Sequence, residues 1–289
     1  MISFDPKDLP VNVLQGYLQS SIAPRPIAFA STVDADGKPN LSPFSFFNVF
    51  SSNPPILVFS PSRRVRDNST KHTLDNAEAT REVVINVVNY EIVQQMSLSS
   101  TEYPEGVNEF EKSGLTMLKS DVVKPFRVAE SPVQFECKVN DIIELGTKGG
   151  AGNLIICEVL KFHVSKEVLN KDKSINQKKL DLVARAGGNV YSRANKGFFE
   201  IPKPLSSLGI GIDNMPDFVK NSMILTGNDL GMLGNVESLP GKKEVNEFIK
   251  DLSNRYPNIK KMSHREKHKL ARNYLSYGDV DSAWKILLS

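Results

Sequence analysis

Short polar residues interrupt an apolar stretch near the N-terminus, at Ser42, Ser45 and Asn48. A plain core hairpin would carry more Val and Ile at such positions, because β-branched side chains suit a half-buried strand. The interruptions therefore indicate a role other than packing.

A second group of residues could bind an anion. Residues 60–73 combine hydroxyl groups with four cations, Arg63, Arg64, Arg66 and Lys71, directly after a predicted buried strand and before a predicted helix. Backbone amides at a helix N-terminus, together with the helix dipole, suit a phosphate monoester. The alternative is a polar loop with an ordinary N-cap, and from this stretch alone the two interpretations are even.

Familiar catalytic patterns are nearly absent. His264 and His268 have helical i, i+4 spacing, but the Lys and Arg residues around them favour a surface pair over a metal site. The glycine-rich residues 146–153 lie between two predicted strands, which favours a flexible hairpin tip over a phosphate loop. Cys137 and Cys157 fall in alternating runs and are expected to be buried core thiols. We predict no side-chain catalyst and no metal ligand.

Composition excludes several classes of protein. The 289 residues carry a formal net charge of +3, without the strong basic excess expected of a nucleic-acid-binding protein. No apolar run reaches the roughly 18 residues of a membrane span, and the N-terminus lacks the pattern of a signal peptide. We expect a cytoplasmic protein that binds neither nucleic acid nor membrane.

The pattern of elements predicts an antiparallel barrel followed by helices. Asp36-Gly37 is a strong hairpin signal, and Pro54-Pro55 breaks the chain again. The predicted strands are Ile22–Val33, Leu41–Phe50, 56–60, 82–89, 133–146 and 153–169, with helices at Lys71–Ala79 and Ile92–Leu98. Six or seven strands joined by short turns indicate a barrel.

The last part of the chain has a different, helical pattern. Apolar residues recur at i, i+3, i+4 and i+7 from Val245 to Leu252, with Phe248 and Ile249 between them. We therefore expect two parts, residues 1–204 and residues 205–289. The second is expected to cover the barrel or to extend a dimer contact.

Several motifs occur in an order that resembles the flavin reductase-like family of FMN-binding split-barrel proteins, which includes flavoredoxin-type and ferric-reductase-type members. The motifs are Pro24-Arg25-Pro26-Ile27-Ala28, Asn40 to Asn48, Ser52-Asn53-Pro54-Pro55, Lys71-His72-Thr73 and the closing Arg185, Gly187, Gly188 and Tyr191. The resemblance covers roughly residues 20–204. It implies a mainly β, antiparallel, Greek-key split barrel with a C-terminal helical extension.

The resemblance also implies positions for the cofactor, which would be FMN, with FAD as an alternative. Ser42, Pro43, Phe44, Ser45 and Phe46 would line the isoalloxazine edge. Phe59 and Ser60 match the positions that line the ribityl chain, and Arg63, Lys71 and Thr73 match the phosphate end.

The implied activity is hydride transfer from NADH or NADPH to flavin in a cytosolic homodimer, with the flavin in a cleft between subunits. Stacking of nicotinamide on flavin needs no side-chain acid or base. Electrons would pass to free flavin, ferric complexes or a partner oxygenase. The alternatives are an electron-transfer protein reduced by another protein, and a split barrel without catalytic activity. Arg25 could contact the flavin or a nicotinamide phosphate, or pair with a carboxylate at the dimer interface. Arg185 is expected to hold the C-terminal segment over the barrel, and His163 to be a core or interface residue.

Overall fold

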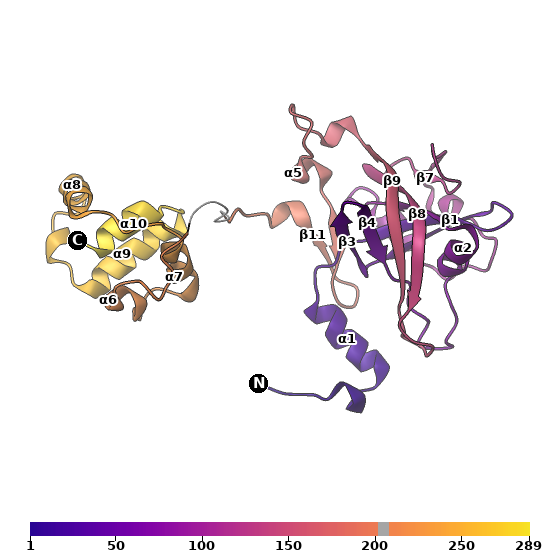
Figure 1. Ribbon diagram of the computed structural model, residues 1–289, viewed down its shortest axis with the longest axis horizontal. Coiled ribbons are helices and arrows are strands. Elements are labelled where there is room, and N and C mark those ends of the chain that lie inside the picture. Colours follow the sequence, from indigo (N-terminus) through magenta and orange to yellow (C-terminus); the bar gives the residue numbers. More distant parts are fainter. Residues whose placement is uncertain (202–207) are drawn as a thin grey trace. The chain divides into compact units, whose positions relative to one another are not determined.

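Seven antiparallel strands form one sheet in the computed structural model, which describes residues 1–201 and 208–289 (Figure 1). In spatial order the strands are β2 (Pro39–Phe44), β1 (Ala28–Val33), β5 (Glu82–Asn86), β8 (Val133–Glu144), β9 (Asn153–Val164), β4 (Pro55–Phe59) and β3 (Phe47–Ser52). Two short antiparallel pairs join β6 (Met117–Leu118) to β7 (Arg127–Val128), and β10 (Val183–Arg185) to β11 (Tyr191–Arg193). The predicted mainly antiparallel fold is confirmed.

The two edge strands of this sheet are consecutive in sequence. β2 and β3 lie at opposite edges, yet only Ser45 and Phe46 separate them along the chain. The sheet must therefore curve until its edges approach each other at this junction, as in a barrel. The N–H of Ser60, which follows β4, donates to the carbonyl of Phe46 at 2.8 Å and ties the junction to the β4 side.

Several strand boundaries differ from the sequence prediction; the predicted strand 153–169, for example, ends at Val164 and is followed by the 3₁₀ turn Lys166–Val168. The predicted strand Leu41–Phe50 is divided into β2 and β3, because the chain crosses between sheet edges at Ser45 and Phe46. The predicted strand Ile22–Val33 begins only at Ala28, since Pro24 and Pro26 have no N–H group for a ladder. The turn at Asp36-Gly37 joins β1 to β2 as predicted, with Gly37 at a φ of 83°.

The interior of the curved sheet is closely packed. Its buried side chains include Phe44, Phe59, Leu74, Ile85, Ile155, Cys137 and Cys157. Both cysteines are free and buried, as predicted. Burial raises the pKa of each thiol well above its usual value, so both are inert apolar fillers.

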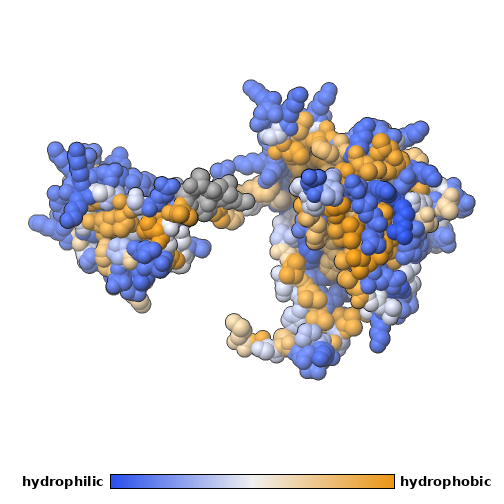
Figure 2. All heavy atoms as spheres, viewed as in Figure 1, coloured by the Kyte–Doolittle hydropathy of each residue, from blue (hydrophilic) through white to orange (hydrophobic). Residues whose placement is uncertain are grey.

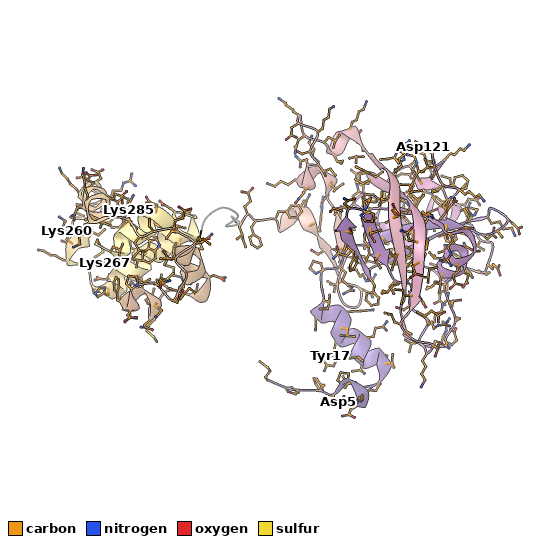
Figure 3. The ribbon with its side chains drawn as sticks, viewed as in Figure 1. Asp5, Tyr17, Asp121, Lys260, Lys267 and Lys285 are labelled. Carbon is orange, nitrogen blue, oxygen red and sulfur yellow. The ribbon has the colours of Figure 1, made fainter. Side chains whose placement is uncertain are left out.

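The helices of residues 1–199 are short. They are α1 (Val11–Ser21), α2 (His72–Thr80), α3 (Val93–Leu98), α4 (Glu109–Ser113) and α5 (Gln177–Leu180), with 3₁₀ turns at Pro6–Asp8, Lys166–Val168 and Ala194–Lys196. The helices predicted at Lys71–Ala79 and Ile92–Leu98 correspond to α2 and α3. α1 has no buried side chain, and its Tyr17 is labelled in Figure 3. The Tyr17 ring lies against the ring of Phe4, with centroids 5.2 Å apart and planes tilted by 38°.

The chain divides into two compact units, Met1–Phe199 and Glu200–Ser289. The predicted boundary near residue 205 lies outside the described residues. The second unit contains α6 (Asp217–Lys220), α7 (Gly227–Gly234), α8 (Lys242–Leu252), a 3₁₀ turn (Ile259–Lys261), α9 (His264–Ser276) and α10 (Val280–Leu287). Its core surrounds Trp284, whose indole N–H donates to the carbonyl of Leu233 at 2.9 Å.

Among the described residues, none of the helices is both long and apolar enough to cross a membrane.

Candidate functional site

The junction between β2 and β3 brings most of the predicted site residues together. Phe44 ends β2 with a buried ring that packs against the ring of Phe59, with centroids 5.4 Å apart. Ser45 and Phe46 form the crossing itself, and Ser60 is bonded to it through the carbonyl of Phe46. We call this junction, Ser45 and Phe46 between β2 and β3, the seam. Its main-chain and hydroxyl groups are therefore held at fixed positions on the sheet.

Two cavities flank this seam and share Arg25 and Ser45 in their walls. The first, about 240 Å³ in volume, is also lined by Pro43 and Phe44. The second, about 330 Å³, includes Phe46, Phe59 and Ser60. Together they give room of the size that small-molecule sites have.

A smaller recess lies along β2 from the seam, and its walls hold Lys71, Arg64, several hydroxyl groups and the carboxylate of Glu102. Its walls include Ser42, Lys71 and Thr73, together with Ser99 and Thr101. The Thr73 hydroxyl is buried and accepts from the Asn40 amide at 2.9 Å. Burial lowers the pKa of the Lys71 ammonium, and the nearby Arg64 lowers it further. Among the described residues, Lys71 forms no ion pair, so its charge is available to an anion.

The three arginines of the predicted anion loop are each paired with a carboxylate, although Arg64 also lines the recess. Arg64 and Arg66 both donate to Glu102, at 3.0 and 2.7 Å. Arg64 also donates to Ser69 Oγ at 2.8 Å, which holds the loop in shape. The guanidinium of Arg63 lies 3.7 Å from Glu144 and does not line the Lys71 recess.

The recess also contains a buried carboxylate that the sequence did not single out. Glu109 is 6 % exposed and accepts from the Leu41 N–H of β2 at 3.0 Å. Burial raises its pKa, because the charged form is poorly solvated there. Glu109 therefore covers an N–H of edge strand β2, next to Ser42.

The glycine-rich hairpin tip forms part of the wall around Ser60. Ala151 accepts from the Arg63 N–H at 2.8 Å, and the Gly150 N–H donates back to Arg63 at 2.9 Å. A Cβ at Gly152 would lie 2.7 Å from Ser60 Oγ. The sequence favoured a flexible tip, whereas the structure shows one that is hydrogen-bonded to the segment after β4.

Arg25 and Arg185 contribute to the first cavity, together with Tyr191. Arg25 is 7 % exposed and donates to the carbonyls of Gln19 and Ile22 at the end of α1. The sequence did not indicate that the two arginines lie together, because their proximity depends on a contact between segments 160 residues apart in the chain.

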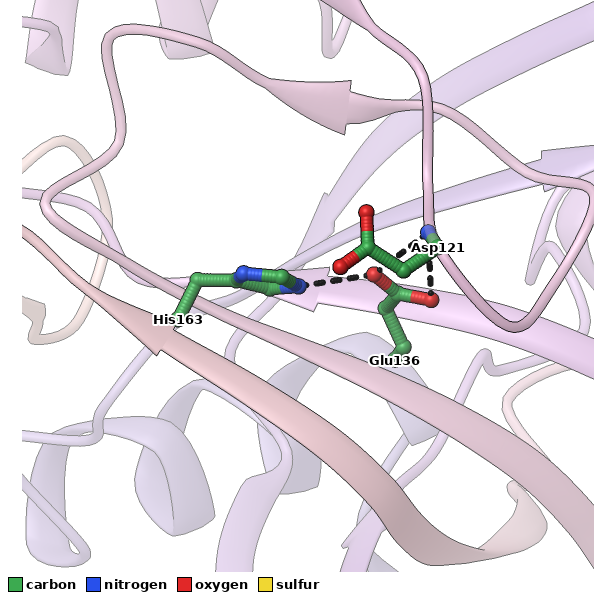
Figure 4. A group of neighbouring side chains, drawn as sticks. All are labelled: Asp121, Glu136 and His163. Carbon is green, nitrogen blue, oxygen red and sulfur yellow. Dashed lines mark hydrogen bonds and ion pairs between the residues drawn. The ribbon is translucent and has the colours of Figure 1, made fainter.

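His163 belongs to a separate charged cluster (Figure 4). Its Nε2 lies 2.7 Å from Oε1 of the fully buried Glu136, which also accepts from the backbone N–H of Asp121 at 2.9 Å. Lys161 and Arg127 lie within 4 Å of Asp121 and balance the two carboxylates. None of these residues lines the cavities at the seam, so the cluster is a structural ion-pair network.

The predicted surface pair of histidines in the second unit is only half right. His264 is exposed and lies against Phe218, with ring centroids 5.0 Å apart. His268 is buried, and its Nδ1 lies 2.7 Å from Ser222 Oγ. The Ser222 oxygen accepts from the N–H groups of Ile224 and Leu225, so its hydroxyl donates to His268.

Comparison with known proteins gives a consistent result for the first unit. A family model described as a flavin reductase like domain matches residues 20–183. An uncharacterized protein of Aquifex aeolicus is 39 % identical over 173 residues, which is 60 % of this chain and 86 % of that protein. A second, from Halalkalibacterium halodurans, is 36 % identical over 183 residues, which is 63 % of this chain and 87 % of its own length.

Solved structures share the fold. Nitrilotriacetate monooxygenase component B from Bacillus cereus superposes with a TM-score of 0.65 and 29 % identity, covering 70 % of this chain and 98 % of that one. A Shewanella frigidimarina protein with a split barrel domain gives a TM-score of 0.59 at 24 % identity, covering 70 % and 100 %. The curved sheet is therefore a split barrel, as the sequence resemblance implied.

Proposed function

The chain belongs to the flavin reductase-like family, and we propose that it binds FMN and transfers a hydride to it from NADH or NADPH. The observation that carries the proposal is the seam at Ser45 and Phe46. Cavities lie on both sides of the seam, and a recess that holds Lys71 and several hydroxyls lies along β2 from it.

The donor set of the site fits a flavin mononucleotide. The main chain and side chains from Ser42 to Phe46 would hold the ring. The prediction that Phe59 and Ser60 lie near the ribityl chain rests on the resemblance alone, since both line the second cavity and not the Lys71 recess. Lys71 and Thr73 would bind the phosphate, because an ammonium beside buried hydroxyls matches a phosphate dianion. The prediction for Arg63 rests on the resemblance alone, since its guanidinium is turned to Glu144.

A bound flavin supplies the redox chemistry by accepting a hydride from the nicotinamide. The chain's contribution is to orient two flat rings and to exclude water around them. The largely apolar second cavity, lined by Phe46, Phe50 and Val58, suits that task. No titrating side chain is required, in keeping with the predicted lack of a catalytic residue.

We also propose that two copies associate through the sheet around β4. β3 and β9 flank β4 and leave large apolar side chains exposed, and Figure 2 shows apolar surface over this unit. The most exposed are Val49, Phe50, Leu160 and Phe162. Contiguous exposed apolar surface marks an interaction site, and the second cavity, which includes Phe50, opens beside it.

The electron acceptor is proposed by analogy. The Bacillus cereus structure is named as a component of a monooxygenase, which supports delivery of reduced flavin to a partner oxygenase over reduction of ferric complexes. A cytoplasmic location fits a nicotinamide-dependent enzyme with two free thiols.

Binding and reduction are tested separately. Purified protein is titrated with FMN and with riboflavin, which lacks the phosphate, and the loaded protein is then mixed anaerobically with NADH or NADPH. We expect FMN to bind more tightly than riboflavin, and the flavin absorbance to bleach within the enzyme's turnover time. FMN uptake without bleaching would favour the electron-transfer alternative, and no uptake would refute the proposal.

Lys71→Ala is the diagnostic variant. Loss of a charge-assisted hydrogen bond worth about 1.5–3 kcal/mol should weaken FMN binding roughly 10- to 100-fold and leave riboflavin binding unchanged. Arg66→Ala is the matched control, because that cation of the same loop is 69 % exposed and paired with Glu102. Equal losses for both ligands in Lys71→Ala would contradict the assignment of the phosphate end.

A further inference from the structure

Two arginines with like charge face each other at the first cavity. Arg25 and Arg185 form an isolated antiparallel bridge, in which each backbone N–H donates to the other's carbonyl at 2.8 Å. Like charges at directly opposed positions of an antiparallel pair destabilise it. Their mutual repulsion also contributes, after burial, to the lowered pKa of Arg25.

Both guanidinium groups donate their hydrogen bonds to neutral acceptors, which are carbonyl and hydroxyl oxygens. Arg25 donates to the carbonyls of Gln19, Ile22 and Ala186, at 2.6 Å for Ile22 and 3.1 Å for Ala186, and its Nε lies 3.4 Å from Ser45 Oγ. Arg185 donates to the Tyr191 hydroxyl and to the Gly188 carbonyl, at 2.6 Å for the carbonyl.

In residues 1–201 and 208–289, neither arginine has a carboxylate within ion-pair distance. Neither positive charge therefore has an anionic partner, although the carbonyls at the C-terminal end of α1 offset part of the charge of Arg25. Arg25 is buried and Arg185 is half-buried. Holding an unpaired charge away from water is costly, and a guanidinium cannot lose its proton to avoid that cost. The first cavity therefore favours a ligand that carries negative charge.

The position of Arg25 and Arg185 indicates which part of a bound flavin they would face. Both arginines line the cavity bounded by Pro43, Phe44 and Ser45, whereas Lys71 and Thr73 line the recess beside Ser42. Ser42 and Ser45 are three residues apart, roughly 10 Å in an extended strand. If the phosphate lies at Lys71, as proposed above, the arginine pair lies at the ring end of the flavin.

We propose that Arg25 and Arg185 stabilise the negative charge that the flavin ring gains on reduction. The nicotinamide loses a hydride and becomes a cation, the hydride's two electrons and proton go to flavin N5, and the ring changes from neutral to anionic. Fixed positive charge next to the ring favours the anionic state and has no such effect on the neutral one. The pair therefore raises the reduction potential of the bound flavin, an inference that rests on the proposed function.

The test is the midpoint potential of the FMN-loaded full chain, measured by equilibration with a reference dye. Arg185→Gln should bind oxidised FMN as wild type does and bind reduced FMN about tenfold less tightly, which for a two-electron couple is a potential about 30 mV lower. Arg185→Lys keeps the charge and should restore most of the potential.

Arg193→Gln is the control, because Arg193 lies on the same hairpin but is paired with Asp181 at 2.5 Å and lines a different cavity. Its potential should equal that of wild type. Arg25→Lys is the second variant, and it keeps the positive charge. Arg25→Gln is avoided, because it would also remove the hydrogen bonds from Arg25 to the carbonyls at the end of α1.

The outcomes are distinct. An unchanged potential in Arg185→Gln with a raised KM for the nicotinamide would overturn the inference, and would assign the pair to the anionic part of that substrate. An equal fall in Arg193→Gln would also overturn it. A chain that takes up no flavin refutes the proposed function and this inference together, whereas flavin uptake with equal potentials refutes the inference alone.

Discussion

His268 couples protonation to the folding of the second unit. Burial and the neighbouring His264 hold its pKa below the usual value, and its Nδ1 must stay unprotonated to accept from Ser222. Below about pH 6.5 the unfolded chain therefore binds more protons than the folded one. The stability of the unit is complete above that pH and falls as the pH drops through it.

Hydrogen exchange of the full chain checks this at the level of single helices. We expect peptides from α9 and α10 to exchange faster at about pH 5.5 than at about pH 7.5, after correction for intrinsic rates, while the barrel strands change little. His268→Gln should remove the difference, and His264→Gln, an exposed neighbour, should retain most of it. Persistent acid sensitivity in His268→Gln would show that another group is responsible.

At the level of elements, the hairpin tip between β8 and β9 depends on the close approach of Gly152 to Ser60. Gly152→Ala should destabilise the barrel by about 1–3 kcal/mol through overpacking, because its Cβ would meet Ser60 Oγ at 2.7 Å. Adding Ser60→Ala removes the clashing atom and should recover part of the loss, as measured by chemical unfolding.

Gly16→Ala provides the contrast for that experiment. Gly16 lies inside α1, and a methyl group added there would have nothing within 4 Å. Its replacement should be neutral or stabilising by up to about 1 kcal/mol through helix propensity. Equal destabilisation at both glycines would contradict the packing explanation.

The sequence predicted elements better than it predicted how they meet. The hairpin at Asp36-Gly37, the paired strands around Cys137 and Cys157 and the helix from Val245 to Leu252 all follow from local patterns. α7 was missed, because the glycines in residues 227–234 obscure a helix that Thr226 and Asp229 cap reciprocally.

The site was predicted where it lies on one continuous stretch and missed where it does not. Ser42 and Ser45 stand out by being polar within an apolar run, although the crossing between sheet edges leaves no local signal. The Arg25–Arg185 bridge depends on pairing between distant segments, so no spacing rule reveals it. The partners of Arg63 and Arg64 follow from side-chain directions that a row of basic letters does not specify.

For the whole molecule, the proposed association of two copies makes a direct prediction. Leu160→Asp places a charge on a β9 position that is 50 % exposed in the single chain. Sedimentation should show a dimer for wild type and a monomer for this variant, because burying an unpaired carboxylate opposes association. FMN should also bind more weakly, since the resemblance places the cofactor between subunits.

Tyr277→Asp is the control for that variant. Tyr277 belongs to the second unit, is 83 % exposed and undergoes the same kind of change. It should leave both the dimer and the FMN affinity unaltered. A wild-type chain that sediments as a monomer would refute the proposed association.

The position of Trp284 makes tryptophan fluorescence a probe of the second unit. It is the sole tryptophan of the sequence, and it is buried in the core of the second unit. Intrinsic indole emission therefore reports on that unit alone, while flavin emission would report on the first. Because indole emission overlaps flavin absorption, quenching of the tryptophan lifetime by energy transfer would serve as a ruler between the two units in solution.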